Sequence, residues 1–257
     1  MSNKEYASII QDSGQDPSRR ILIATPTLGT VRMEWVQARY GQTIPTNWSM
    51  LQYVQFVNSF IPMRYTVADA QNVIVKQLID LKYEWLLLLE DDTIPPPDAF
   101  VRFNDYMRTK KVPVVSGLYY TRSNPPEPLI FRGRGTSYYG NWKAGDKVWC
   151  DGVPTGMLLI HNSILKSMWD ESPEYMAGDT KTRRVFETPE RHWFNEETGE
   201  FSTVGGTSDL EWCTRVITEK HFEKAGWRDY QRKKYPFLVD TSILCKHIDR
   251  ETGVQYP

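Results

Sequence analysis

Uninterrupted apolar runs alternate with amphipathic stretches along the first half of the chain. The run of four leucines at 86–89 has the character of a strand buried on both faces, and two further strands are predicted at 21–24 and 112–118. A polar–apolar alternation at 51–57 predicts one more strand. Helical spacing of apolar residues predicts helices between them: 31–41, 67–81 and 97–107. Strands that alternate with helices predict βαβ units, and so an α/β fold with a Rossmann-like, mostly parallel sheet flanked by helices.

The second half of the chain has a weaker period. Strands are expected at 153–160 and 237–239, and helices at 163–169 and 208–225. A charged stretch with Pro and Gly at 171–206 is expected to be a long, partly ordered loop, of the kind that serves as a lid or binding loop. We expect a flexible arm at 1–19 and a single domain at 20–257.

Composition narrows the setting of this domain. The 257 residues carry 31 basic and 32 acidic side chains, so no overall field recruits polyanions. Three widely spaced cysteines fit a reducing compartment and suggest no disulfide framework. The start of the chain lacks the apolar core of a signal peptide, and no apolar run reaches the roughly 18 residues of a membrane span. A cytoplasmic protein with no membrane insertion is expected.

Three carboxylates directly follow the leucine strand. Glu90, Asp91 and Asp92 stand where open α/β sheets bind their ligands, at the carboxyl end of a strand. Crowded carboxylates repel one another unless a cation neutralises them, and hard oxygen ligands suit Mg²⁺ or Mn²⁺. A solvated turn that precedes a helix is the alternative. The metal site is favoured, because such a turn does not require three acids after a fully buried strand.

Two further segments are weaker candidates for ligand contacts. The loop Thr25, Pro26, Thr27 follows the first strand, where its backbone and hydroxyls could hold a base or a ribose. An ordinary turn between strand and helix explains it as well. Asn72 and its neighbour Gln71 are amides in an amphipathic helix and, taken alone, are expected to face water.

Two candidates for chemistry lie near the C-terminus. Asp209 is in the first turn of a helix, where the helix dipole keeps a carboxylate ionised, as a general base requires. Ser208 and Glu211 read as a capping box, which accounts for Glu211 but not for Asp209. His247 follows a short strand in a tail that could fold back over a metal, although a lone histidine is more often a packed residue.

Basic and aromatic residues are mixed in two segments, 131–139 and 230–235. Such mixtures bind phosphates and stack on sugars or bases, but they also occur as ordinary solvated loops.

Taken in order, these motifs resemble the GT-A fold glycosyltransferases, especially family-two-like members, including those encoded by bacteriophages. The similarity spans about 21–248 and rests on six matches: 70–72 with the family's Ala-Arg-Asn helix motif, 88–98 with its D-x-D strand and Pro-rich helix start, 116–119 with the next strand, 155–160 with the acceptor-side glycine, 208–213 with the Glu-Asp motif, and 246–248 with the C-terminal histidine. Three residues depart from the pattern. Glu90 replaces the usual first Asp, Gln71 stands where Arg is common, and Ser208 stands where Glu is common.

The resemblance implies a metal-dependent, inverting glycosyltransferase, expected to move a hexose from a UDP-linked nucleotide sugar to an acceptor hydroxyl. It implies a nucleotide-sugar half at about 20–118 and an acceptor half at about 119–257. The residues that it implies for each role are these: Asp92, Glu90 and His247 for Mn²⁺ or Mg²⁺, Asp209 for the catalytic base, and Thr25, Pro26, Thr27, Asn72, Glu90 and Asp91 for the nucleotide sugar.

Two other readings share this sheet and acidic site. A nucleotidyltransferase is one, although it would call for Lys or Arg in the loop after the first strand, and 25–30 has neither. A non-catalytic protein that binds a sugar or nucleic acid is the other. The acceptor stays open between a modified DNA base, a saccharide, a lipid-linked sugar and a protein. The protein would act in the host cytoplasm if it is phage-encoded.

Overall fold

The structure is a computed structural model that describes residues 20–45, 47–48, 59–133, 138–196 and 200–257. The arm expected at 1–19 and the strand expected at 51–57 lie outside these residues.

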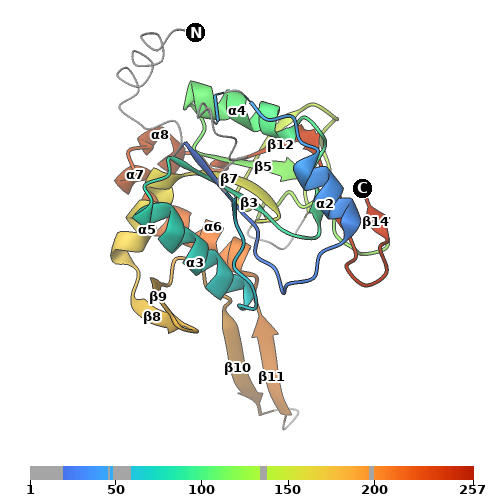
Figure 1. Cartoon of the computed structure of the whole chain (residues 1–257). Helices are drawn as coiled ribbons and strands as arrows, with labels where there is room; N and C mark the ends of the chain where they lie inside the picture. The colour runs from blue at the N-terminus through green and yellow to red at the C-terminus, as the bar shows by residue number, and fades with distance from the viewer. Residues whose placement is uncertain (1–19, 46, 49–58, 134–137, 197–199) are drawn as a thin grey trace.

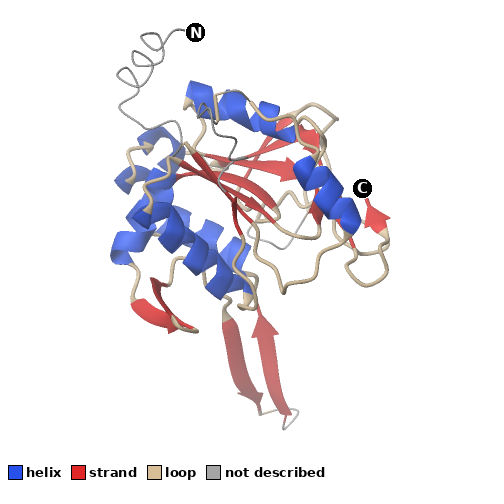
Figure 2. Cartoon of the chain, in the orientation of Figure 1, coloured by secondary structure: helices blue, strands red, loops and turns tan. Residues whose placement is uncertain are grey.

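A central seven-stranded sheet has the order β2-β1-β3-β7-β5-β12-β6. Figure 2 shows its strands in red among the blue helices. Its strands are β1 (Ile21–Ala24), β2 (Ser59–Phe60), β3 (Trp85–Leu89), β5 (Val114–Leu118), β6 (Lys147–Cys150), β7 (Met157–His161) and β12 (Phe237–Leu244). Five of them run in one direction, and β7 and β6 run against them. The predicted α/β class with a mostly parallel sheet is therefore confirmed. Both halves of the chain contribute strands to it.

Helices cover both faces of this sheet (Figure 1). One face carries α2 (Met33–Tyr40) and α4 (Ala99–Thr109), and the other carries α3 (Val67–Asp80), α5 (Asn162–Glu171) and α6 (Ser208–Thr218). Because side chains alternate along a strand, Leu86 and Leu88 pack into the core under the second set, and Leu87 and Leu89 into the core under the first. The leucine run thus fills two cores at once, which is why it has no polar position.

The C-terminal segment returns to the end of β3. Strand β12 shifts register between Asp240 and Leu244, and the chain then forms β13 (Lys246–Ile248). That strand pairs with β4 (Thr93–Ile94) on one side and β14 (Gln255–Tyr256) on the other. The tail is therefore hydrogen-bonded directly to the segment that follows the three carboxylates.

The prediction of a long, partly ordered loop at 171–206 is wrong, because this stretch forms two β-hairpins. The first joins β8 (Glu174–Ala177) to β9 (Thr180–Arg183), and the second joins β10 (Glu190–Asn195) to β11 (Glu200–Gly205). Gly178, with φ +54°, and Asp179 form the two-residue turn of the first, a Gly/Asp signal for a hairpin. This hairpin packs on α3, whereas the second projects from the body (Figure 1).

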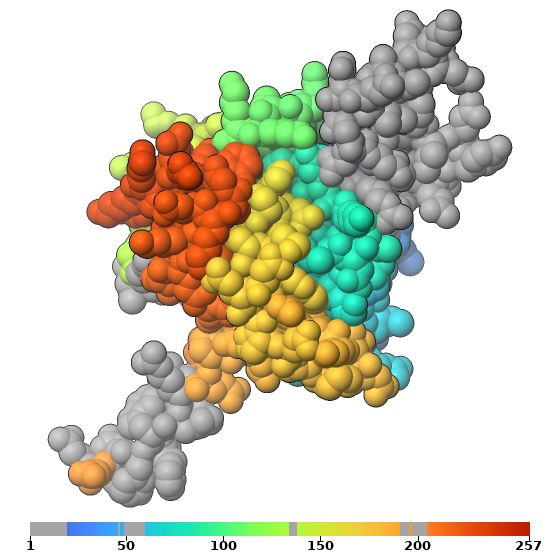
Figure 3. All heavy atoms as spheres, turned by 90° about the vertical axis from the view of Figure 1, so that its left-hand side faces the viewer, coloured from blue at the N-terminus to red at the C-terminus, as the bar shows by residue number. Residues whose placement is uncertain are grey.

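The helix expected at 208–225 is also interrupted. It ends as α6 at Thr218, and Lys220 takes a left-handed φ of +61° before α7 (His221–Lys224) and α8 (Arg228–Gln231). The break lets the chain turn, so that α7 contacts both α5 and α8 (Figure 3, where α5 is yellow and α7 and α8 are orange-red).

Candidate active site

The three carboxylates stand in a turn between β3 and β4. The Thr93 N–H donates to the Glu90 carbonyl, and the Glu90 N–H donates to the carbonyl of Gly156, which immediately precedes the neighbouring strand β7. Asp91 and Asp92 are buried, at 1% and 5% exposure, and Glu90 is half-buried. The solvated acidic turn considered as an alternative is thereby excluded for these residues.

Two arginines neutralise part of this negative charge. Arg250 forms ion pairs with Asp91 and with Asp92, the latter at 3.3 Å, and an Arg122 nitrogen lies 3.9 Å from the same Asp92 oxygen. Sequence reasoning missed both arginines, since they lie in loops with no period. A basic residue three positions after His247 was the available signal for Arg250.

His247 lies beside Asp92 because β13 pairs with β4. Its Nδ1 donates to the carbonyl oxygen of Tyr120 at 2.8 Å, since a carbonyl can only accept, and its Nε2 faces Asp92 Oδ2 at 3.6 Å. Although burial is the largest influence and acts upward, His247, Arg250 and Arg122 together lower the pKa of Asp92. Asp92 is therefore an ionised carboxylate at neutral pH.

Two observations bear on whether a metal fits here. Asp92 Oδ1 is buried with no hydrogen-bond partner, and Nδ1–H bonding to a carbonyl is the arrangement that orients a metal-binding imidazole. Across the described part of the chain, however, no three His, Cys, Asp or Glu side chains are grouped as a metal site. Asp92 and His247 thus offer two ligands, and the remaining ligands of an ion would come from water or a bound substrate.

Glu90 and Asp91 have different surroundings from Asp92. Burial first, and then the charge of Asp92, raise the pKa of Glu90 to about 8, against a hydrogen bond of 2.8 Å from the Thr155 hydroxyl. Burial also raises the pKa of Asp91, opposed by the Thr27 hydroxyl and by Arg250. The three acids are therefore not equivalent.

A cavity of about 300 Å³ opens above these carboxylates. Its lining combines the loop after β1, the start of α3, the acids and both arginines: Pro26, Thr27, Leu28, Tyr65, Val67, Ala70, Glu90, Asp92, Arg122 and Arg250. Of the three loop residues singled out from the sequence, Pro26 and Thr27 line the cavity, and Thr25 is buried next to them. The cavity presents carboxylate oxygens to a cation and guanidinium groups to an anion.

Asn72 does not line this cavity. Its amide donates to the Phe186 carbonyl and the Tyr175 hydroxyl and accepts from the Phe186 N–H, so it ties α3 to the segment after β9. The expectation that these amides face water is wrong, because Gln71 and Asn72 are 0% and 1% exposed. The expected contact between Asn72 and a donor has no support from this geometry.

Asp209 lies in the first turn of α6, half-buried. Its Oδ1 accepts a 2.8 Å hydrogen bond from the Leu210 N–H, and its charge is near enough to act on the pKa of Glu90. Burial raises the pKa of Asp209, against hydrogen bonds from Thr207 and Leu210.

The expected capping box is wrong. Thr207 is the N-cap residue, the Ser208 hydroxyl donates to Gln71, and Glu211 pairs with Arg215 at 3.5 Å. Ser208 lies inside the helix, one residue after the N-cap, so its hydroxyl does not cap the helix and donates to a buried acceptor on α3 instead.

Gly156 is required where β7 begins. A Cβ there would overlap the Tyr119 hydroxyl and lie 2.6 Å from Thr93 Oγ1, while the Gly156 N–H donates to Tyr119 at 2.8 Å. The glycine thus allows Tyr119 and Thr93 to pack directly behind the carboxylate turn.

The two basic–aromatic segments meet at the far edge of the sheet. Arg132 lies over Tyr139 and Tyr235, at 3.7 and 4.6 Å from the ring centres, and Lys233 lies 4.0 Å from the ring centres of Trp149 and Tyr230. These cations are engaged with rings of the protein itself.

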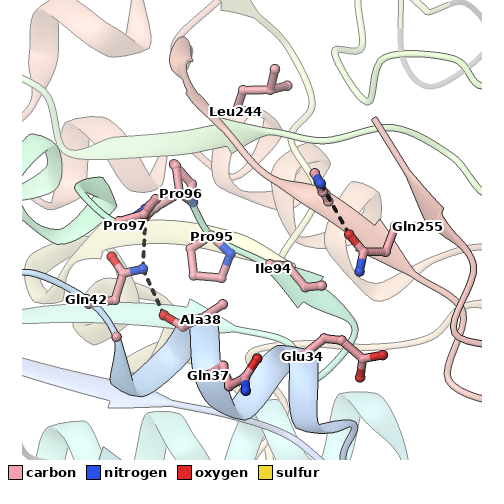
Figure 4. Close-up of a pocket in the computed structure, with 12 residues that line it drawn as sticks. Glu34, Gln37, Ala38, Gln42, Ile94, Pro95, Pro96, Pro97, Leu244 and Gln255 are labelled. Atoms are coloured by element: carbon pink, nitrogen blue, oxygen red, sulfur yellow. Dashed lines mark hydrogen bonds between the residues drawn. The ribbon is translucent and has the colours of Figure 1, made fainter.

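A second cavity, of about 590 Å³, lies between α2, Pro95–Pro97 and strands β13 and β14 (Figure 4). Gln42 braces it by donating to the Ala38 and Pro96 carbonyls. It shares no lining residue with the cavity at the carboxylates.

Comparison with known proteins supports the fold. The structure is similar to the crystal structure of A197 from STIV, with a TM-score of 0.53 and 15% identity over 90% of this chain and 87% of that chain. A putative glucose-1-phosphate thymidylyltransferase from Bacillus anthracis, in complex with sucrose, has a TM-score of 0.32 and 11% identity over 65% and 62%, too low to carry an argument. No family model and no curated protein sequence matches the chain.

Within the described residues, every helix is too short or too polar to cross a membrane.

Proposed function

We propose that this protein is a glycosyltransferase that moves a sugar from a nucleoside diphosphate sugar, UDP-linked in the first instance, to an acceptor hydroxyl. The observation that carries the proposal is the position of His247 beside Asp92, whose carboxylate lines one cavity with Arg122, Arg250 and the loop after β1. Residues from both ends of the chain meet there at the carboxyl end of the sheet, where such folds bind nucleotides.

Asp92 and His247 would hold Mn²⁺ or Mg²⁺, with Glu90 as a further contact. When bound, the ion supplies positive charge to the departing diphosphate. Arg122 and Arg250, which line the same cavity, would bind phosphate oxygens, since guanidinium groups pair with phosphate bidentately. Thr27 and Pro26 would contact the nucleoside, and Asp91 would hold Arg250 in place.

Asp209 is the general base of the proposed reaction. It takes the proton of the acceptor hydroxyl while the acceptor oxygen forms a bond to C1 of the sugar. The bond between C1 and the phosphate oxygen breaks on the opposite side, and nucleoside diphosphate leaves with the electron pair. Displacement in a single step inverts the anomeric centre. The projecting hairpin β10–β11 ends at Gly205, shortly before Asp209 in sequence, and is a candidate contact for the acceptor.

The reaction is tested by identifying its products. Purified protein is incubated with a panel of nucleotide sugars, Mn²⁺ or Mg²⁺, and acceptors that include saccharides and DNA with hydroxyl-bearing modified bases. Release of nucleoside diphosphate with glycosylated acceptor is expected, and a chelator should abolish it. Release of pyrophosphate instead would identify a nucleotidyltransferase. Tight binding of nucleotide sugar without turnover, across the whole panel, would identify a non-catalytic binding protein.

A further inference from the structure

Four polar side chains form an unbroken line of hydrogen bonds beneath the proposed active site. Ser208 donates to Gln71 at 2.9 Å, Gln71 donates to Thr155 at 3.1 Å, and Thr155 donates to Glu90 at 2.8 Å. The members come from four separate elements: the start of α6, the middle of α3, the loop before β7, and the turn after β3. Ser208, Gln71 and Thr155 are all buried.

The line has one direction. Gln71 accepts from Ser208 through its oxygen and donates to Thr155 through its nitrogen, and the Thr155 hydroxyl then has its own proton free for Glu90. Buried polar groups cost stability unless they are hydrogen-bonded, and groups that polarise one another in a chain are strengthened together. Apolar side chains of similar size would fill the same space, so the polar line calls for a role other than packing.

Its two ends are the two chemical parts of the site. Glu90 lies in the cavity with Asp92, and Ser208 immediately precedes Asp209. Thr207, the N-cap residue, makes no side-chain hydrogen bond that caps the helix. The Ser208–Gln71 hydrogen bond instead anchors the first turn of α6 to α3. The Leu210 N–H then fixes the carboxylate of Asp209 relative to that turn.

We propose that Gln71 and Thr155 are positioning residues, which hold the first turn of α6, and with it Asp209, in a fixed place relative to Glu90 and the bound donor. The inference rests on the proposed function, in which Asp209 takes the acceptor proton. A base that is displaced by about 1 Å costs on the order of a hundredfold in rate, whereas the donor contacts proposed for Asp92, Arg122 and Arg250 are left intact.

Three variants and one control test the role. Thr155→Val removes the hydroxyl at nearly constant volume, Thr155→Ser keeps the hydroxyl, and Gln71→Met breaks the line at a second point. Thr218→Val is the control, since Thr218 also donates through its hydroxyl, but to a backbone carbonyl in the exposed last turn of α6. For each protein, kcat, the KM for the donor, the melting temperature and amide hydrogen exchange at 208–211 are measured.

Thr155→Val and Gln71→Met are expected to lower kcat by about 10- to 100-fold with the donor KM within about threefold. Exchange at 208–211 should rise by about tenfold, as the loss of one hydrogen bond allows. Thr155→Ser and Thr218→Val should stay close to wild type. Unchanged kcat and unchanged exchange in Thr155→Val would overturn the proposal, and so would equal losses in Thr155→Val and Thr155→Ser, because the methyl group would then be what matters.

Failure of the proposed function would be seen separately. If wild-type protein turns over no nucleotide sugar, the exchange measurement still decides the structural half. Faster exchange at 208–211 in Thr155→Val but not in Thr218→Val would support the anchoring of α6, and equal exchange in both would overturn it.

Discussion

The hydroxyl of Ser208 donates a 2.9 Å hydrogen bond to the side-chain oxygen of Gln71, 137 positions away in the chain. These two residues are also two of the three at which the chain departs from the pattern of the family that it resembles, which commonly has Glu and Arg there. The structure brings both departures into contact. A neutral donor and acceptor stand where the pattern would place two opposite charges, so the pair stays complementary without burying a charge.

Charging one member alone should therefore destabilise the protein. Gln71→Arg or Ser208→Glu would each bury an unpaired charge, at an expected cost of about 3–5 kcal/mol. The double variant pairs the two charges, and we expect it to be less destabilised than the sum of the single variants by about 0.5–3 kcal/mol. Urea unfolding of all four proteins measures this coupling. Strict additivity would show that the two side chains act independently.

The main layers of the fold follow from local pattern. The leucine run and the helices at 67–81 and 97–107 were predictable from their patterns. A strand buried on both faces is apolar at every position, whereas a helix buried on one face is apolar at every third or fourth position. The antiparallel direction of β7 in the middle of the sheet was not, since strand direction depends on pairing between distant segments and not on a local period. The hairpins at 174–183 and 190–205 were missed because the many charges, Pro and Gly of this stretch were taken as signs of an irregular loop.

Gly156 should not tolerate a side chain. Gly156→Ala places a methyl group against Tyr119 and Thr93, both of which are buried, and overpacking of this kind costs about 1–3 kcal/mol. Gly140→Ala is the matched control, because a Cβ at Gly140 meets nothing within 4 Å, and it should change stability by less than about 0.5 kcal/mol. Thermal unfolding compares the two variants. Equal melting temperatures would show that the turn at Gly156 relaxes freely.

Glu90 should weaken the fold as pH rises. Its pKa is about 8 in the folded protein, and an unfolded glutamate titrates near about 4.3, so the folded state binds more protons between these values. The free energy of unfolding therefore falls from about pH 4 to about pH 8, as Glu90 must ionise in its buried site. In chelator, Glu90→Gln should raise the melting temperature at pH 8 and change it little at pH 4, since Gln still accepts the Thr155 hydrogen bond.

Asp92→Asn gives the opposite sign in the same experiment. The folded pKa of Asp92 is lowered, so its ion pairs add stability above the unfolded pKa and lose it as pH falls through the folded value. The Asn variant should melt below wild type at pH 7 and approach it near pH 3. A Glu90→Gln gain that does not increase with pH would contradict the assigned surroundings of the acidic turn.

The acidic turn was predictable because position at a strand end and residue type suffice to mark it, whereas His247 was singled out only through its place in the family resemblance. Arg122 and Arg250 were not predictable, since a cation in an irregular loop has no pattern until pairing of β13 with β4 brings it to the site. The role of Gln71 was hidden for the same reason. The helical pattern predicts only whether Gln71 faces the core or the solvent. Its hydrogen-bond partners, Thr155 and Ser208, come from much later in the chain.

The most direct test of the account compares Asp209→Asn with wild type at saturating donor, Mn²⁺ and a competent acceptor. Asparagine keeps the shape of the side chain but cannot take a proton, so nucleoside diphosphate release should fall by about 10²- to 10⁴-fold. Binding of nucleoside diphosphate with Mn²⁺ should stay within about threefold of wild type, whereas Asp92→Ala should abolish it. Full transfer rates in both Asp209→Asn and Asp92→Ala would contradict the account.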